Sequence, residues 1–267
     1  MHDPTYADFH VHTRLSPCGK AEATAAAMVQ RALDKGLAAL GFADHYTPAP
    51  VPGCPFYADQ RLHILGALRA ELERVGEANG LALLVGIEAD YTLAGEGCLD
   101  REALRQADHV VCASSHFHLP ASPQPTDDSP QSRATLMLDM ARAALGVPGI
   151  SIWAHPFDCS RMRPLLPILA TVGEDEFAAM IDLTNARQVA IEVNGGPAQW
   201  SDYREATAPF LRLARDMGAR FTITSDAHHP DDLDRLDLAW SWAHRLGLRP
   251  RDLITAEELI ERQRRKR

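Results

Sequence analysis

Residues 7–19 read ADFHVHTRLSPCG, a short apolar run that ends in two histidines one residue apart. Because side chains of a β-strand alternate between its two faces, His10 and His12 point the same way. Two neutral imidazoles on one face can bind one metal ion. A surface strand that happens to carry two histidines explains the same pattern, so the rest of the chain has to separate these two interpretations.

Six further short apolar runs follow, and longer helical patterns separate them. These runs read LAALGFADH, LALLVGIEA, DHVVCASSH, GISIWAHP, QVAIEVNGG and ARFTITSDAH. The segment from Asp59 to Asn79 is the clearest helix, since leucines recur there at helical spacing. Seven strand–helix units in succession predict an α/β fold whose parallel strands close into a barrel or form a doubly wound sheet.

The composition limits the classes of function that fit this chain. Its 267 residues are 46% hydrophobic, carry a formal net charge of −9 and include five cysteines in no paired spacing. The acidic balance argues against a long nucleic acid as partner, although a local basic patch stays possible. No apolar run approaches the roughly 20 residues of a membrane span, and the first residues resemble no secretory signal. We therefore expect a reduced, cytoplasmic protein that does not enter a membrane.

Residues able to bind a metal ion stand at the ends of six of the seven predicted strands. The carboxyl ends of parallel barrel strands share one rim, where barrel enzymes place their sites. An unpaired buried polar group costs on the order of 1–3 kcal/mol, so a core does not accumulate many without a partner. Metal ions satisfy imidazoles and carboxylates together. The residues are His10, His12, His45, Glu88, His116, His155, Asp226 and His228.

Seven motifs together resemble the PHP (polymerase and histidinol phosphatase) family of metal-dependent phosphoesterases. They read DFHVHT, GFADHYTP, GIEAD, SSHFH, AHPF, IEVNGG and TSDAH, in order from about Asp8 to Asp232. The chain length and the DHYTP and SHF segments look most like stand-alone histidinol-phosphatase-type enzymes. The resemblance implies one domain over residues 1–267, folded as a distorted (β/α)7 TIM-like barrel. A basic helical tail from about residue 251 ends the chain, and we expect its charges to be solvated.

The resemblance also implies two or three divalent metal ions, which would be zinc, manganese or iron. The first position would be held by His10, His12, Glu88 and Asp226, the second by Glu88 as a bridge with His116 and His155, and the third by His45 and His228. The family normally has one more histidine at the third position, where this chain has Cys18. A cysteine thiolate is a good zinc ligand. Cys18 therefore completes the third position, leaves it weak or empty, or is simply a small buried cysteine.

The implied reaction is hydrolysis of a phosphoester by a hydroxide that bridges two metal ions and attacks phosphorus. Asp226 would orient or deprotonate the water, either a metal ion at the third position or His228 would assist the leaving oxygen, and Glu88 would hold two metal ions. The first expectation for the substrate is a small phosphomonoester, either histidinol-phosphate-like or a nucleotide. A phosphodiesterase or exonuclease acting on nucleotides or oligonucleotides, and a non-catalytic metal-binding scaffold, are the alternatives.

Residues that would contact the substrate are harder to identify. Phosphate needs cationic contacts, and Arg14, Arg161 and Arg163 directly follow two of the motifs. His118 lies just beyond His116 and would touch the substrate or face solvent. The segment from Phe117 to Ser132 is rich in proline, serine and aspartate and too long for an ordinary connection, which predicts a lid. The sequence leaves the oligomeric state open.

Overall fold

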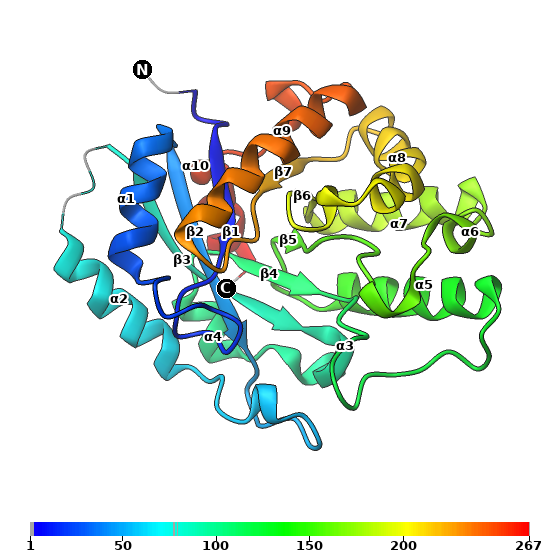
Figure 1. Ribbon diagram of the computed structural model, residues 1–267, viewed down its shortest axis with the longest axis horizontal. Helices are drawn as coiled ribbons and strands as arrows, with labels where there is room; N and C mark the ends of the chain where they lie inside the picture. Colours follow the sequence, from blue (N-terminus) through cyan, green and yellow to red (C-terminus); the bar gives the residue numbers. More distant parts are fainter. Residues whose placement is uncertain (1–2, 77, 79, 267) are drawn as a thin grey trace.

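The computed structural model describes residues 3–76, 78 and 80–266. Seven strands lie side by side in chain order, every neighbouring pair is parallel, and helices surround the sheet (Figure 1). The strands are β1 (Ala7–Val11), β2 (Ala39–Tyr46), β3 (Ala82–Asp90), β4 (Val110–Ala113), β5 (Ile152–Trp153), β6 (Ala190–Asn194) and β7 (Phe221–Thr224). This arrangement confirms the predicted α/β fold with a distorted seven-stranded barrel.

The helices follow the strands, as short βα connections require. The α-helices are α1 (Ala25–Lys35), α2 (His63–Val75), α3 (Tyr91–Ala94), α4 (Arg101–Gln106), α5 (Pro130–Gly146), α6 (Leu166–Leu169), α7 (Glu174–Arg187), α8 (Ser201–Asp216), α9 (Arg235–Leu246) and α10 (Ala256–Lys266). The 3₁₀ helices are η1 (Pro55–Tyr57), η2 (Gly95–Cys98), η3 (Ser160–Met162), η4 (Pro197–Gln199), η5 (Pro230–Asp234) and η6 (Pro250–Asp252). No helix within the described residues is long and apolar enough to cross a membrane.

The barrel is nearly closed where β1 meets β7. One parallel bridge joins Val11 to Ala227, and the His12 amide donates to the Ala227 carbonyl at 2.8 Å. Just below, the buried Asp8 carboxylate accepts from the Ser225 amide at 3.1 Å and from the Ser225 hydroxyl at 2.5 Å. The bond to the Ser225 amide takes the place of a main-chain hydrogen bond that the distorted strands do not form between them. Asp8 therefore joins the first and last strands directly beneath the two histidines of the first motif.

The interior of the barrel is narrow, and two glycines create room in it. The buried His109 ring lies among the strands and its Nε2 is 2.9 Å from the Phe9 carbonyl oxygen. A Cβ placed on Gly86 would come within 2.4 Å of this ring, and one on Gly41 within 2.9 Å. Glycine is required at both positions because the imidazole occupies the space of a side chain. His109 is thus a structural residue of the barrel interior.

Two segments differ from the sequence-based expectation. The helix expected over Asp59–Asn79 is α2, which begins at His63, after the turns that follow η1, and ends at Val75; Gly76 caps it with a positive φ of 74°. Asn79 lies outside the described residues. The basic tail is α10, and its end is not simply solvated, because the Lys266 ammonium donates to the Ile150 carbonyl at 2.6 Å. Leu259 of the same helix is fully buried against the inner face of the barrel.

Candidate metal centre

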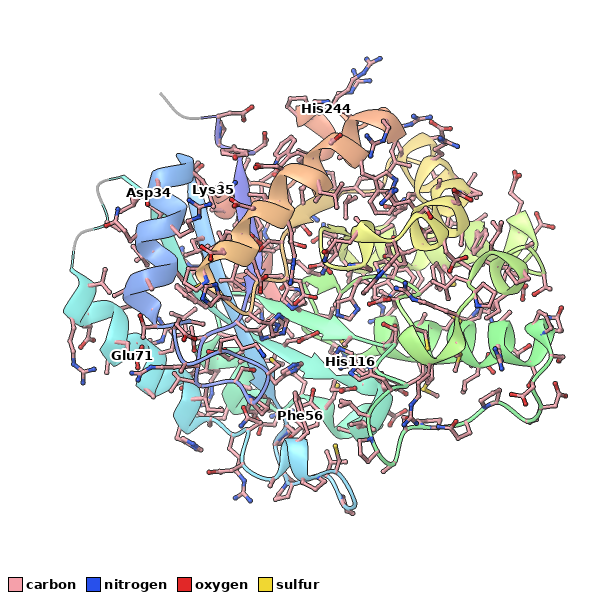
Figure 2. The ribbon with its side chains drawn as sticks, viewed as in Figure 1. Asp34, Lys35, Phe56, Glu71, His116 and His244 are labelled. Carbon is pink, nitrogen blue, oxygen red and sulfur yellow. The ribbon has the colours of Figure 1, made fainter. Side chains whose placement is uncertain are left out.

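A cavity of about 210 Å³ opens at the carboxyl ends of the strands. The lining combines side chains that the sequence predicted with Phe56, Leu119 and Asp158. The predicted residues in the lining are His12, Cys18, His45, Glu88, His116, His118, His155, Asp226 and His228. Phe56 and His116, which come from segments far apart in the chain, are both labelled in Figure 2. The rim therefore gathers the ends of β1, β2, β3, β4, β5 and β7 around one space.

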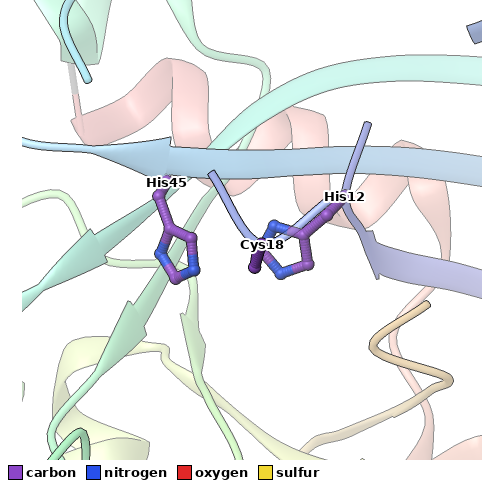
Figure 3. Close-up of side chains that lie close together, drawn as sticks. All are labelled: His12, Cys18 and His45. Atoms are coloured by element: carbon purple, nitrogen blue, oxygen red, sulfur yellow. The ribbon is translucent and has the colours of Figure 1, made fainter. Parts of the chain in front are cut away.

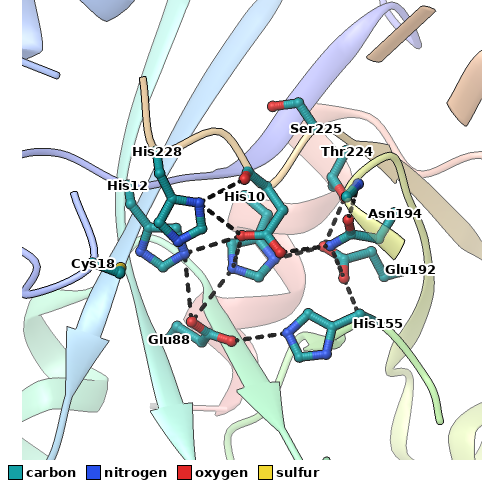
Figure 4. Close-up of polar contacts among 12 residues, drawn as sticks. His10, His12, Cys18, Glu88, His155, Glu192, Asn194, Thr224, Ser225 and His228 are labelled. Atoms are coloured by element: carbon teal, nitrogen blue, oxygen red, sulfur yellow. Dashed lines mark hydrogen bonds and ion pairs between the residues drawn. The ribbon is translucent and has the colours of Figure 1, made fainter. Parts of the chain in front are cut away.

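Glu88 lies at the centre of the cluster, near the end of β3, with 1% of its surface exposed. Its Oε2 is 3.5 Å from the Nε2 atoms of both His10 and His12 and 3.0 Å from the His45 Nδ1. Its Oε1 is 3.3 Å from the His155 Nε2 and 3.6 Å from the His116 Nε2. Figure 4 shows Glu88 between His10, His12 and His155. Each oxygen of one carboxylate thus faces its own group of imidazoles.

The electrostatics of this cluster keep Glu88 ionised. Burial by itself raises the pKa of a carboxyl group, because a buried charge loses its hydration. The imidazoles of His45 and His10 outweigh burial and hold the pKa of Glu88 well below its usual range. In the opposite sense, burial lowers the pKa of His12 to about 4, so this imidazole is neutral at pH 7 with a free lone pair.

Asp226 supplies a second carboxylate from the segment that follows β7. Its φ is +55°, an uncommon conformation for a residue other than glycine, which turns its side chain back over β1. Its Oδ1 is 3.3 Å from the His12 Nε2 and 3.8 Å from the His10 Nε2. The His228 Nδ1 lies 3.8 Å from the same oxygen. Histidines of the first motif therefore face two carboxylates, one from β3 and one from the end of β7.

Cys18 returns to the site through a tight turn of the first loop. The Ser16 amide donates to the Thr13 carbonyl, and the Gly19 amide donates to the Ser16 carbonyl, both at 3.0 Å. A Cβ on Gly19 would lie 1.9 Å from the Thr13 carbonyl oxygen, so only glycine permits this path. Ligand atoms of Cys18, His12 and His45 lie within 4.8 Å of one another (Figure 3). Burial raises the pKa of the Cys18 thiol.

Glu192, in the middle of β6, is a residue of the site that the sequence analysis did not identify. It is fully buried, and its Oε1 is 2.7 Å from the His10 Nδ1. It also accepts from the His155 amide at 2.5 Å and from the Thr224 hydroxyl at 2.8 Å. Because an ionised carboxylate only accepts, Nδ1 of His10 carries a proton, which makes Nε2 the nitrogen that faces Glu88 and would bind a metal ion. The IEVNGG motif contained this glutamate, but it stands before the strand end.

The residues present fit a bound metal centre, as one orphaned atom indicates. The buried Nε2 of His10 has no hydrogen-bond partner within the part of the chain that the structure describes. Buried polar atoms are nearly always paired, so an unpaired imidazole nitrogen aimed at two carboxylates indicates a missing partner. The neighbouring donors are imidazole nitrogens, carboxylate oxygens and one thiol, which together suit divalent transition metals.

None of the three predicted arginines lines the cavity. Arg14 pairs with Glu71 at 2.6 Å, and 49% of its side chain is exposed. Arg163 pairs with Asp158 at 3.3 Å, and its guanidinium stacks 3.6 Å above the Trp200 ring. Arg161 is exposed at the surface. Among the described residues, no arginine or lysine lines the cavity, so a role for these three in holding phosphate stays a prediction.

The fourth predicted substrate contact, His118, does line the cavity. Burial and the neighbouring His116 lower the pKa of His118 to about 4, so it is neutral at pH 7. Leu119 of the same segment also reaches the cavity and packs in a small cluster with Cys54 and Tyr57. The start of the segment predicted to be a lid, Phe117–Ser132, is therefore part of the cavity wall, whereas its last residues begin α5.

Comparisons with known proteins agree with this geometry. The PHP domain model matches residues 8–145, which is more than half of the chain. A relative from Aliivibrio fischeri, described as a "probable phosphatase", is 29% identical over 260 residues, covering 93% of this chain and 88% of the relative.

Two solved structures share the fold. The structure of hisK from Listeria monocytogenes has a TM-score of 0.65 at 16% identity and covers 86% of this chain and 97% of its own. Histidinol phosphate phosphatase from Lactococcus lactis, complexed with zinc, L-histidinol and phosphate, has a TM-score of 0.63 at 13% identity and covers 92% and 95%. On the family match and the barrel that carries its motifs, this chain belongs to the PHP domain family.

Proposed function

We propose that this protein is a metal-dependent phosphatase that hydrolyses a small phosphomonoester. The observation that carries the proposal is Glu88, whose two buried oxygens face five imidazoles within 3.6 Å. A carboxylate so placed is suited to bridge two cations, because each oxygen faces its own set of nitrogen donors. The A. fischeri relative, described as a probable phosphatase, supports the same class of activity.

The residues that would hold the metal ions fall into three groups. His10, His12, Glu88 and Asp226 would hold the first ion, Glu88 with His116 and His155 the second, and His45 and His228 with Cys18 the third. Bound there, divalent cations would neutralise phosphate charge and lower the pKa of water toward neutrality. The absence of arginine and lysine from the described cavity lining supports this assignment, since cations would then carry the charge that side chains do not.

Two residues of the cavity lining are proposed to take part in proton transfer. The imidazoles of His10 and His12 overcome burial and hold the pKa of Asp226 well below its usual range. Asp226 is therefore ionised at pH 7 and would orient the attacking water and accept its proton. An ion at the third position, or His228 where no ion is bound there, would assist the leaving oxygen; the side chain of His228 is 25% exposed. His228 Nδ1 is 2.9 Å from the Asp226 carbonyl oxygen, so its Nε2 is the nitrogen that would either bind the ion or donate the proton.

The size of the cavity favours a small substrate. About 210 Å³ accommodates a phosphate with a short leaving group, and Phe56 and Leu119 offer that group an apolar wall. Small-molecule sites combine such apolar walls with a few converging polar groups. An oligonucleotide would have to place its phosphodiester at the bottom of the same enclosed space, so we propose a monoester first.

An assay panel with metal supplementation tests the proposal. Protein prepared without chelator and reconstituted with zinc, manganese or iron is expected to bind two or three ions per chain. It is expected to release phosphate from histidinol phosphate or nucleoside monophosphates, and bis-p-nitrophenyl phosphate serves as the diester probe. Less than one metal equivalent, measured by elemental analysis, would contradict the metal centre. Faster cleavage of the diester than of every monoester would make the protein a phosphodiesterase, and a metal-loaded but inactive protein would be a scaffold.

Cys18 gives a second prediction, about the third metal position. Cys18→Ala is expected to reduce the zinc content from three equivalents to two and to slow turnover, because one ligand of that position is lost. Cys18→His is expected to keep three equivalents and to shift preference away from zinc, since a thiolate favours soft cations. Cys98→Ala removes a buried thiol outside the ligand groups and the cavity lining and serves as the control. Unchanged metal content in Cys18→Ala would remove Cys18 from the site.

A further inference from the structure

The connection between β2 and α2 brings a tyrosine into the core of the site. This proline-rich segment carries η1, whose last residue, Tyr57, is fully buried. The backbone amide of Thr47 donates to the Gln60 carbonyl at 2.7 Å, which ties the two ends of the segment together. Tyr57 also packs with Cys54 and Leu119, so this segment and the one after β4 form one wall above the cavity. Neither the proposed ligand groups nor the cavity lining includes Tyr57.

The hydroxyl of Tyr57 contacts an imidazole assigned to the third metal position. Its oxygen is 2.9 Å from the His45 Nδ1, and the two rings pack edge to face at 5.4 Å. The Asp90 carboxylate interacts with the same hydroxyl and, through Oδ2, lies 2.8 Å from the His116 Nδ1. Tyr57 and Asp90 therefore connect the Nδ1 atoms of His45 and His116, although neither residue lines the cavity.

The chemistry of these groups fixes where the protons lie. The Asp90 carboxylate accepts from Nδ1–H of His116 and interacts with the Tyr57 hydroxyl. The Tyr57 oxygen has lone pairs that can accept from Nδ1–H of His45. A second acceptor near this Nδ1, Glu88 Oε2 at 3.0 Å, favours the same tautomer. Both histidines thus carry a proton on Nδ1, which makes Nε2 the nitrogen that a metal ion would bind.

We infer that Tyr57 is a positioning residue that fixes the ring orientation and tautomer of His45 for the third metal ion. The inference rests on the proposed function, and it assigns a task to the proline-rich segment that the metal ligands alone do not explain. When Glu88 is engaged by cations, Tyr57 is the acceptor that remains for Nδ1–H of His45. Outer partners of this kind typically change metal affinity by 10- to 100-fold.

The test measures zinc affinity directly, apart from catalysis. Tyr57→Phe keeps the buried ring and removes only the hydroxyl, so the barrel is expected to remain folded. Titration against a chromophoric chelator is expected to show the third zinc equivalent bound about 10- to 100-fold more weakly, with the first two unchanged. The matched control is Tyr46→Phe. Tyr46 is also buried and is the neighbour of His45 in the chain, but its hydroxyl donates to Asp100 at 2.8 Å and not to a group of the metal site.

The possible outcomes separate this inference from the proposed function. If wild-type protein binds fewer than three equivalents, the third position itself is wrong, and the inference fails with it. If wild-type protein binds three zinc equivalents, and the zinc affinity of Tyr57→Phe for each equivalent stays within about threefold of the wild-type value, the hydroxyl does not position His45. Equal weakening of all three equivalents, or the same loss in Tyr46→Phe, would indicate a general loosening of the rim and would also overturn the inference.

Discussion

Glu88→Gln is expected to lose metal binding and hydrolysis together while the barrel stays folded. The amide keeps the shape of the side chain, but it removes the negative charge that would offset two cations. A bound metal ion contributes several kcal/mol of charge stabilisation, and each 1.36 kcal/mol is tenfold in rate. We therefore expect kcat to fall by at least about a thousandfold and the metal content to fall below one equivalent.

Elemental analysis, phosphatase assays and circular dichroism on the same preparation check this result. The control is Glu174→Gln, which neutralises an exposed carboxylate in the first turn of α7, outside the cavity. Full metal content with a wild-type rate in Glu88→Gln would show that Glu88 does not bridge two metal ions. An unfolded variant would show that the buried imidazoles need this charge even for folding.

Glu192→Ala is expected to lower the free energy of unfolding by about 3–5 kcal/mol, the usual cost of removing one partner of a buried charged pair. Glu192 is fully buried, and its loss leaves Nδ1 of His10, the His155 amide and the Thr224 hydroxyl without their acceptor. Glu192→Gln retains one carbonyl oxygen, so its free energy of unfolding is expected to fall by less. Urea denaturation of metal-free protein measures both, with Glu174→Ala as the surface control.

The pH dependence of this contribution follows from the pKa of Glu192. Burial would raise that pKa, but the contact with His10 outweighs burial and lowers it below its usual value. A carboxyl group whose pKa is lower in the folded protein stabilises it fully above the unfolded value of about 4.3. The difference in free energy of unfolding between wild type and Glu192→Gln is therefore expected to be constant near neutral pH and to shrink below about pH 4. A difference that grows on acidification would contradict this account.

The sequence by itself determined the parallel α/β fold, which the resemblance of its motifs specified as a barrel, and most of the candidate metal centre. Strand side chains alternate with a period of two, and parallel strands end on a common rim, so residues at successive strand ends had to converge. His10, His12 and Glu88 were predictable in this way, and the structure places their ligand atoms within 4.8 Å of one another. The motif order added Cys18, which the structure brings beside His12 and His45.

Only the tertiary structure decided which groups support the imidazoles and which cations stay outside. Glu192 lies in the middle of β6 and Tyr57 lies in η1, so neither stands at a strand end that a periodic pattern predicts. Their roles depend on contacts with His10 and His45. Arg14 and Arg163 lie next to motifs in the chain, yet neither is part of the described cavity lining: Arg14 pairs with Glu71, and Arg163 pairs with Asp158, which does line the cavity. Strand periodicity fixes the direction of a side chain, whereas a hydrogen-bond partner depends on distances between segments that only folding sets.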